Sequence, residues 1–247
     1  MRHIVWGLPA FFLVACSHFS TPRNIEQAKV LLQVGTEHLN KREYHKALEA
    51  THQAIKHDPT YASAYNHLAL IHMEMKNFEK SEQAFNRALD IQPDYPEVFN
   101  NVGVLRNRQE RYAEALVQFE KALQSDHYPT PENALTNMGY AYYRLGELSL
   151  AKVHHQKALD LVPNFCLASK NLGDVYAKEK NFSKASEHFH RAMTHCPLFQ
   201  ESQYKLGLAL MKLGKKAGAK FELKRLLARH KSGPYVEKSQ QILKLLR

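Results

Sequence analysis

The chain has 247 residues, enough for one or two ordinary domains or one array of repeats. Hydrophobic residues make up 44% of it, while Gly and Pro number ten each, which excludes a collagen-like chain and argues against disorder. The formal charge is +10, without any run of five Lys and Arg residues. We therefore expect a charge spread over the fold, facing solvent, nucleic acid, anionic lipid or an acidic protein.

Residues 1–16 have the features of an export signal. A short basic start, Met1-Arg2-His3, precedes an apolar run over residues 4–14 that is too short for a permanent span but typical of a signal peptide. The run ends in Leu13-Val14-Ala15-Cys16, which resembles a bacterial lipobox, in which the cysteine receives the lipid. The alternative is an ordinary signal peptide with a chance cysteine.

The residue after the cysteine bears on the predicted location. It is Ser17 rather than Asp, which by analogy with bacterial sorting rules favours the outer membrane. Acyl chains on Cys16 would anchor the protein there, facing the oxidising periplasm. Residues 17–27 are then expected to form a tether and the start of the first helix.

A pattern of about 34 residues recurs along the rest of the chain. Its small residues lie 34, 34, 36, 34 and 34 positions apart, at Gly35, Ala69, Gly103, Gly139, Gly173 and Gly207. Four units close with a proline, at Pro59, Pro93, Pro163 and Pro197. Small residues let two antiparallel helices approach closely, and proline ends the second helix because it lacks an N–H. One such hairpin cannot bury its apolar stripe alone, so the units are expected to stack.

This pattern resembles the tetratricopeptide repeat at nearly every signature position. The resemblance implies an all-α fold, a right-handed superhelix of six helix-turn-helix repeats followed by a capping helix. The repeats are predicted at residues 28–61, 62–95, 96–131, 132–165, 166–199 and 200–233, and the capping helix at 234–247.

The first helix of each repeat is expected to line a concave groove. Asn101, Asn137 and Asn171 share one repeat position, where a row of amides could donate to and accept from the backbone of an extended peptide. The alternative is that these amides bond only neighbouring helix ends. The predicted groove residues are Asn66, Asn100, Asn101, Asn107, Arg108, Thr136, Asn137, Tyr140, Tyr143, Lys170, Asn171, Lys178 and Tyr204.

Two further cysteines frame the fifth repeat. Cys166 opens its first helix and Cys196 closes its second, so antiparallel packing brings the two ends side by side. A disulfide needs Cα atoms about 4.4–6.8 Å apart, which such ends can reach, and an oxidising compartment favours it. The alternative is two separate small hydrophobic residues.

Catalytic and metal-binding motifs are absent from the sequence. The fifteen histidines include no HExxH motif, and there is no CxxC, GxSxG or phosphate-binding loop. We therefore predict no enzyme activity, no cofactor and no metal site.

The whole chain resembles the type IV pilus biogenesis lipoproteins of the Tgl, PilF and PilW kind. The more specific features are Tyr128-Pro129 in the two-residue insertion before the fourth repeat, Asn100-Asn101-Val102-Gly103 opening the third, and the cysteine pair, which looks like that of Tgl. PilF-like members lack the pair.

The resemblance implies a monomeric pilotin that binds secretin subunits rather than nucleic acid and promotes their assembly at the outer membrane. Alternatives are an adaptor for a protease or a peptidoglycan enzyme, or a subunit of the β-barrel insertion machinery.

Overall fold

The computed structural model describes residues 22–246, which form thirteen helices and contain no strand. The predicted signal peptide and Cys16 lie outside the described residues. The helices are α1 Pro22–Asn40, α2 Tyr44–His57, α3 Ala62–Glu74, α4 Phe78–Ile91, α5 Pro96–Arg108, α6 Tyr112–Leu123, α7 Pro131–Leu145, α8 Leu148–Leu161, α9 Cys166–Lys178, α10 Phe182–His195, α11 Gln200–Lys212, α12 Lys216–Arg229 and α13 Pro234–Leu245.

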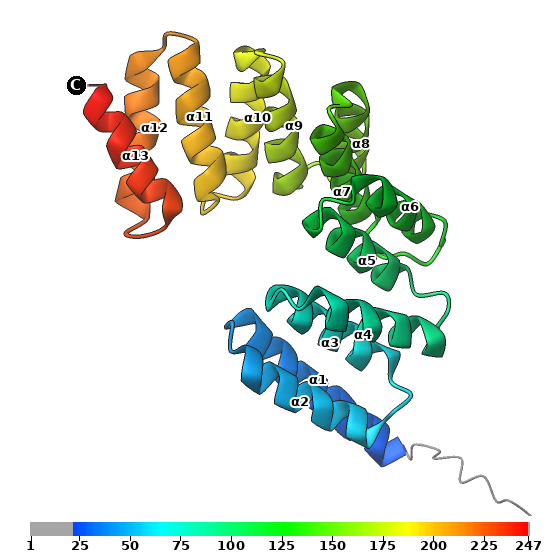
Figure 1. Cartoon of the computed structure of the whole chain (residues 1–247). Coiled ribbons are helices and arrows are strands. Elements are labelled where there is room, and N and C mark those ends of the chain that lie inside the picture. Colours follow the sequence, from blue (N-terminus) through cyan, green and yellow to red (C-terminus); the bar gives the residue numbers. More distant parts are fainter. Residues whose placement is uncertain (1–21, 247) are drawn as a thin grey trace, which may run out of the picture.

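The first twelve helices form six consecutive hairpins that follow a curved path (Figure 1). The first helices of the first five repeats, α1, α3, α5, α7 and α9, contact one another in order, and α11 contacts α13. This arrangement places the odd-numbered helices along the inner wall of the arc, with the even-numbered helices behind them. The all-α superhelix predicted from the repeat period is confirmed.

Helix ends follow local chemistry. Proline begins α5, α7 and α13, where its missing N–H costs no hydrogen bond and its fixed φ suits the first turn. The short turn inside each hairpin contains one left-handed residue at the same repeat position, for example Lys180 at φ 61° and Gly146 at φ 88°. A left-handed residue reverses the chain within a short turn, which lets the second helix pack directly on the first.

The small residue in each first helix marks the closest approach within a hairpin. A Cβ atom added to Gly173 would lie 2.6 Å from Cε1 of Phe189, and one added to Gly139 would lie 2.5 Å from Cε1 of His155. Both distances are shorter than real carbon contacts, so a larger residue here would force the ring of the partner side chain to shift. The partner position, sixteen residues later, is filled by Thr51, Phe85, Phe119, His155, Phe189 and Leu223 in the six repeats.

The hydrophobic core is a row of small clusters, one after another along the arc. Phe85 packs with Val98 and Leu105 of the next repeat, and Phe119 packs with Met138 in the same manner. Tyr128, from the two-residue insertion, is buried beside Phe119 and fills the wider step between the third and fourth repeats. Each repeat therefore completes its core only with its neighbour, as stacked repeats require. Among the described helices, none is both long and apolar enough to cross a bilayer.

Candidate peptide-binding groove

A chain of asparagine side chains runs along the inner wall from the second to the fourth repeat. Asn137 donates to Asn100 with an Nδ2–Oδ1 distance of 3.0 Å, and Asn101 donates to Asn66 at 3.0 Å. A longer contact of 3.5 Å joins Asn100 to Asn101. The four side chains, Asn66, Asn101, Asn100 and Asn137, thus form one connected row, here called the amide ladder.

The amide ladder has a regular construction. In each link between repeats, an asparagine at the sixth position of one repeat donates to an asparagine at the fifth position of the preceding repeat. All four side chains are partly exposed, and an amide has two N–H donors and an oxygen with two lone pairs. Each therefore retains hydrogen-bonding capacity for the backbone of a bound peptide.

The ladder ends before Asn171, although the sequence predicts Asn171 as its third member. The fifth position of the preceding repeat is Thr136, and no hydrogen bond joins the two side chains in the described structure. Thr136 is 1% exposed, so the expectation that it lines the groove is not met. Threonine is shorter than asparagine, and its Oγ1 is buried without a hydrogen-bond partner among the described residues. Asn107 is also mostly buried, where its Nδ2 donates to the carbonyl of Asn137 at 3.4 Å.

Two predicted cations of the groove, Arg108 and Lys178, have partners on the preceding repeat, and so does the neighbouring Arg144. Arg108 pairs with Glu74 at 2.5 Å, and Arg144 pairs with Glu110 at 3.3 Å. Lys178 donates to the backbone carbonyl of Tyr143 and lies 4.5 Å from the centroid of its ring. These contacts brace successive first helices against each other, so the rim of the groove is held in place before any partner binds.

Two hollows open on the inner wall of the later repeats. The smaller, of about 40 Å³, is lined by Tyr140, Tyr143, His155, Lys170, Asn171 and Asp174. The larger, of about 270 Å³, is mostly apolar and is lined by Asp174, Ala177, Phe182, Phe189, Lys205, Leu208, Ala209 and Lys212. Four predicted groove residues, Tyr140, Tyr143, Lys170 and Asn171, are therefore brought together around one hollow, and Asp174 joins it to the next.

A four-residue ionic network separates the two hollows. Lys205 contacts Asp174 at 2.7 Å and Glu201 at 2.6 Å, while Lys170 reaches the same carboxylates at 3.4 and 3.6 Å. Burial alone lowers the pKa of Lys205, but Asp174 and Glu201 outweigh it and raise that pKa above its ordinary value. The network ties α9 to α11 with two positive and two negative charges.

His155 is the buried residue that the sequence-based site prediction missed. It occupies the position where the second, third and fifth repeats have Phe, is fully buried, and neither ring nitrogen has a hydrogen-bond partner in the described structure. Burial, aided by the charges of Lys170 and His154, lowers its pKa to about 3. Aligning the repeats would have identified His155, because four of the other five repeats have Phe or Leu at this position.

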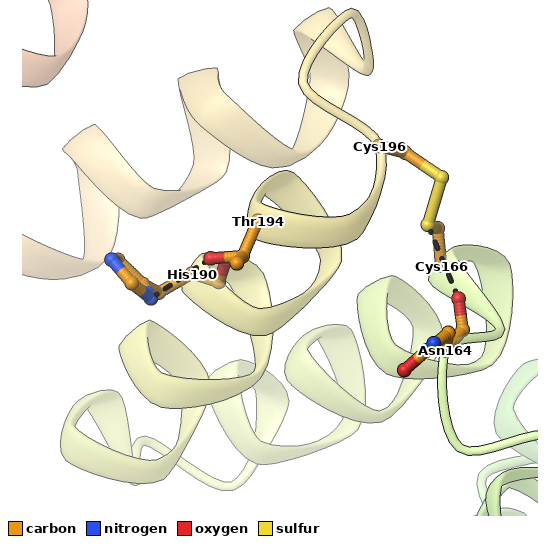
Figure 2. The surroundings of a disulfide bond; sticks show 5 residues. All are labelled: Asn164, Cys166, His190, Thr194 and Cys196. Carbon is orange, nitrogen blue, oxygen red and sulfur yellow. Dashed lines mark hydrogen bonds between the residues drawn. A yellow bond between two sulfur atoms is a disulfide. The ribbon is translucent and has the colours of Figure 1, made fainter.

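The predicted disulfide is present in the structure. Cys166 begins α9 and Cys196 follows α10, with their Cα atoms 6.2 Å apart (Figure 2). The bond therefore closes the base of the fifth hairpin. Tyr204, another predicted groove residue, lies against Tyr235 of α13 with ring centroids 5.5 Å apart.

The described residues hold no cluster of three His, Cys, Asp or Glu side chains suited to a metal ion. The inner wall carries amide side chains, paired charges and an apolar hollow. Surfaces of this kind bind polypeptides.

Comparison with known proteins agrees with this geometry. Family models described as tetratricopeptide repeat match residues 60–126 and 201–232. The fold is a tetratricopeptide-repeat superhelix. Tetratricopeptide repeats typically serve as protein-interaction scaffolds rather than catalysts.

Two solved structures match these repeats over most of the chain. The crystal structure of PilW, described as a widely conserved type IV pilus biogenesis factor, is 26% identical, with a TM-score of 0.75, over 85% of this chain and 97% of PilW. Pseudomonas aeruginosa PilF is 20% identical, with a TM-score of 0.72, over 89% of this chain and 99% of PilF, which shows the fold alone.

Matches among curated sequences are shorter. The ycf37 protein of Pyropia yezoensis is 31% identical over 62 residues, and human tetratricopeptide repeat protein 6 is 34% identical over 77 residues. These alignments span 35% and 14% of those proteins, so they reflect the repeat rather than a shared role.

Proposed function

We propose that this protein is a pilotin, an outer-membrane lipoprotein that binds secretin subunits and promotes their assembly for a type IV pilus. The observation that carries the proposal is the likeness to PilW, which extends over 97% of that chain at 26% identity. What distinguishes this likeness is its identity, because a tetratricopeptide repeat protein from Parabacteroides merdae matches 89% of this chain at only 15% identity.

The groove supports this role chemically. The amide ladder offers donors and acceptors to an extended backbone, and the apolar hollow beside Phe182 and Leu208 accepts a side chain of the same segment. In the proposal, Cys16 carries the lipid, so the groove is delivered to the membrane where the secretin assembles.

The binding test removes the ladder without touching the core. In the variant N100A/N101A/N137A, the inter-repeat amide links are lost, and we expect affinity for a purified secretin subunit to fall about tenfold or more, or at least 1.4 kcal/mol. The matched control is N86A/Q124A/N164A, whose three side chains are exposed away from the ladder. Circular dichroism verifies that both variants are folded.

The outcomes separate the candidate functions. Unchanged secretin binding by the ladder variant refutes groove capture. If the wild-type protein binds no secretin but retains a protease or peptidoglycan enzyme, the adaptor function replaces the pilotin. Changing Cys16 to Ala should move the protein out of the outer-membrane fraction, and an unchanged fractionation would refute the lipid anchor.

A further inference from the structure

The net charge of the chain is concentrated at one end, contrary to the expectation that it is spread over the fold. Residues 200–247 contain 12 of the 34 Lys and Arg residues but only three of the 24 Asp and Glu residues. This fifth of the sequence thus carries +9 of the total +10. The end of the superhelix formed by α11, α12 and α13 is strongly basic, while the other repeats are nearly neutral.

Helix α13 has the place of the first helix of a seventh repeat. It packs on α11 and α12 at the end of the arc (Figure 1), and it follows the 34-residue register of α11. Counted in that register, the face that would contact a second helix carries Glu237, Gln240, Gln241 and Lys244. The same positions in α7 are Leu135, Met138, Gly139 and Tyr142. This face of α13 is therefore polar, with Gln241 where close helix packing needs glycine.

A groove of about 480 Å³ lies between α12 and α13 on this side. It is lined by Lys220, Lys224, Leu227, Gln240, Leu243 and Lys244. The two leucines are partly buried, and none of the three lysines has an ion pair within the described residues. The groove therefore combines an apolar strip with three uncompensated positive charges, and we call it the end groove.

The equivalent site two repeats earlier, between α8 and α9, differs from the end groove in charge. There, Lys152 occupies the position of Lys220 and contacts Glu179 at 2.7 Å. Tyr176, in the position of Lys244, stacks on His188 of α10 with ring centroids 5.3 Å apart. The earlier site keeps a hollow of about 400 Å³, and Gln156 stands there in the position of Lys224, so its one equivalent lysine is paired and the charge is balanced. At the end groove, no described carboxylate pairs with Lys220, Lys224 or Lys244.

We propose that the end groove is a second docking site, separate from the concave groove, and that it takes an acidic amphipathic helix of a partner protein. The helix lies in the groove along α12 and α13. Its carboxylates pair with Lys220, Lys224 and Lys244, and its apolar side chains contact Leu227 and Leu243.

The spacing of the groove residues favours a helix as the occupant. Lys220, Lys224 and Leu227 lie on one face of α12 over two turns, so a parallel or antiparallel helix with acidic residues three or four apart matches them. Exposed ion pairs are weak one by one and screened by salt. Binding should therefore be moderate and should weaken as salt is added.

The test uses the full-length protein in detergent and two labelled peptides of roughly 14 residues, long enough to form a helix. One peptide carries a leucine stripe flanked by glutamates, and the other has lysine in place of every glutamate. We expect the acidic peptide alone to raise fluorescence anisotropy. The variant K220E/K224E/K244E should weaken its binding about tenfold or more. The control K41E/K56E/K180E makes the same charge change at exposed, unpaired lysines elsewhere and should bind as the wild type does.

Several results would overturn the proposal. Equal loss in both charge variants would show a general field effect, and equal binding of both peptides would show simple hydrophobic adsorption. Loss of binding to phosphatidylglycerol vesicles in the groove variant, without loss of peptide binding, would assign the surface to a membrane. A concentration-dependent oligomer dissolved by the groove variant would assign it to a second copy of this chain.

Discussion

The inner wall of this superhelix is built in two different ways along its length. In the second to fourth repeats its centre is neutral, with asparagines linked side chain to side chain from Asn66 to Asn137, and the ion pairs of Arg108 and Arg144 lie at the rim. In the fifth and sixth repeats it is ionic, with Lys170 and Lys205 shared between Asp174 and Glu201. The backbone arrangement is the same in both regions.

The difference shows that one repeat fold can join neighbouring repeats either by amide hydrogen bonds or by ion pairs. Breaking an amide–amide hydrogen bond at an exposed position costs little free energy, because water or a peptide replaces the lost partner. Charges at half-buried positions must be paired, because an unpaired charge there costs several kcal/mol. The neutral region can therefore exchange its bonds with a peptide, while the ionic region and the disulfide hold the neighbouring repeats rigidly.

The largest loss of stability should follow removal of the disulfide. Replacing both Cys166 and Cys196 with Ser removes a cross-link between residues 30 apart, which should lower the free energy of unfolding by about 3–4 kcal/mol. Denaturant unfolding measures the loss, and hydrogen exchange should rise in α9–α11 before it rises in α3–α6. Reductant should leave the double variant unchanged. A loss under about 1 kcal/mol would mean that the ionic network alone braces this region.

Smaller losses of stability should distinguish the amide-linked region from the ionic region. Changing Lys205 to Met leaves Asp174 and Glu201 with Lys170 alone, which should cost roughly 1–3 kcal/mol, less than a fully buried pair because these side chains are partly exposed. Changing Asn100 to Ala should cost about 1 kcal/mol. Added salt should reduce the first cost and not the second, measured by unfolding at low and high ionic strength. Equal salt responses would contradict the distinction.

A gain of stability, rather than a loss, is expected at the buried histidine between the two regions. Changing His155 to Phe removes two unpaired ring nitrogens, so stability at neutral pH should rise by about 1–2 kcal/mol, since Phe189 shows that the slot admits a phenyl ring. Urea unfolding measures the gain. A loss of stability would show that the phenyl ring overpacks this repeat.

The same residue makes stability depend on pH. Burial lowers the pKa of His155 to about 3 and that of His67 to about 4, whereas the unfolded side chains titrate near 6.5. The unfolded state therefore takes up protons first, so stability is fully present above pH 6.5 and falls as the pH drops toward 3. The His155 to Phe variant should lose less stability over this range, while Phe119 to Leu, a change at the same repeat position that leaves both histidines in place, should retain the wild-type slope.

The amino-acid sequence by itself determined the repeat period, the helices, the tight glycine positions and the cysteine pair, because these depend on contacts within one hairpin. Only the tertiary structure decided which asparagines meet, that Asn171 stands apart beside Thr136, and where the basic end opens a groove. Those features arise between repeats, where the identity of the opposing side chain depends on the stacking offset of two helices. The period of 34 residues predicts which side chains lie on the inner wall. It does not predict which side chain of the adjacent repeat each of them contacts.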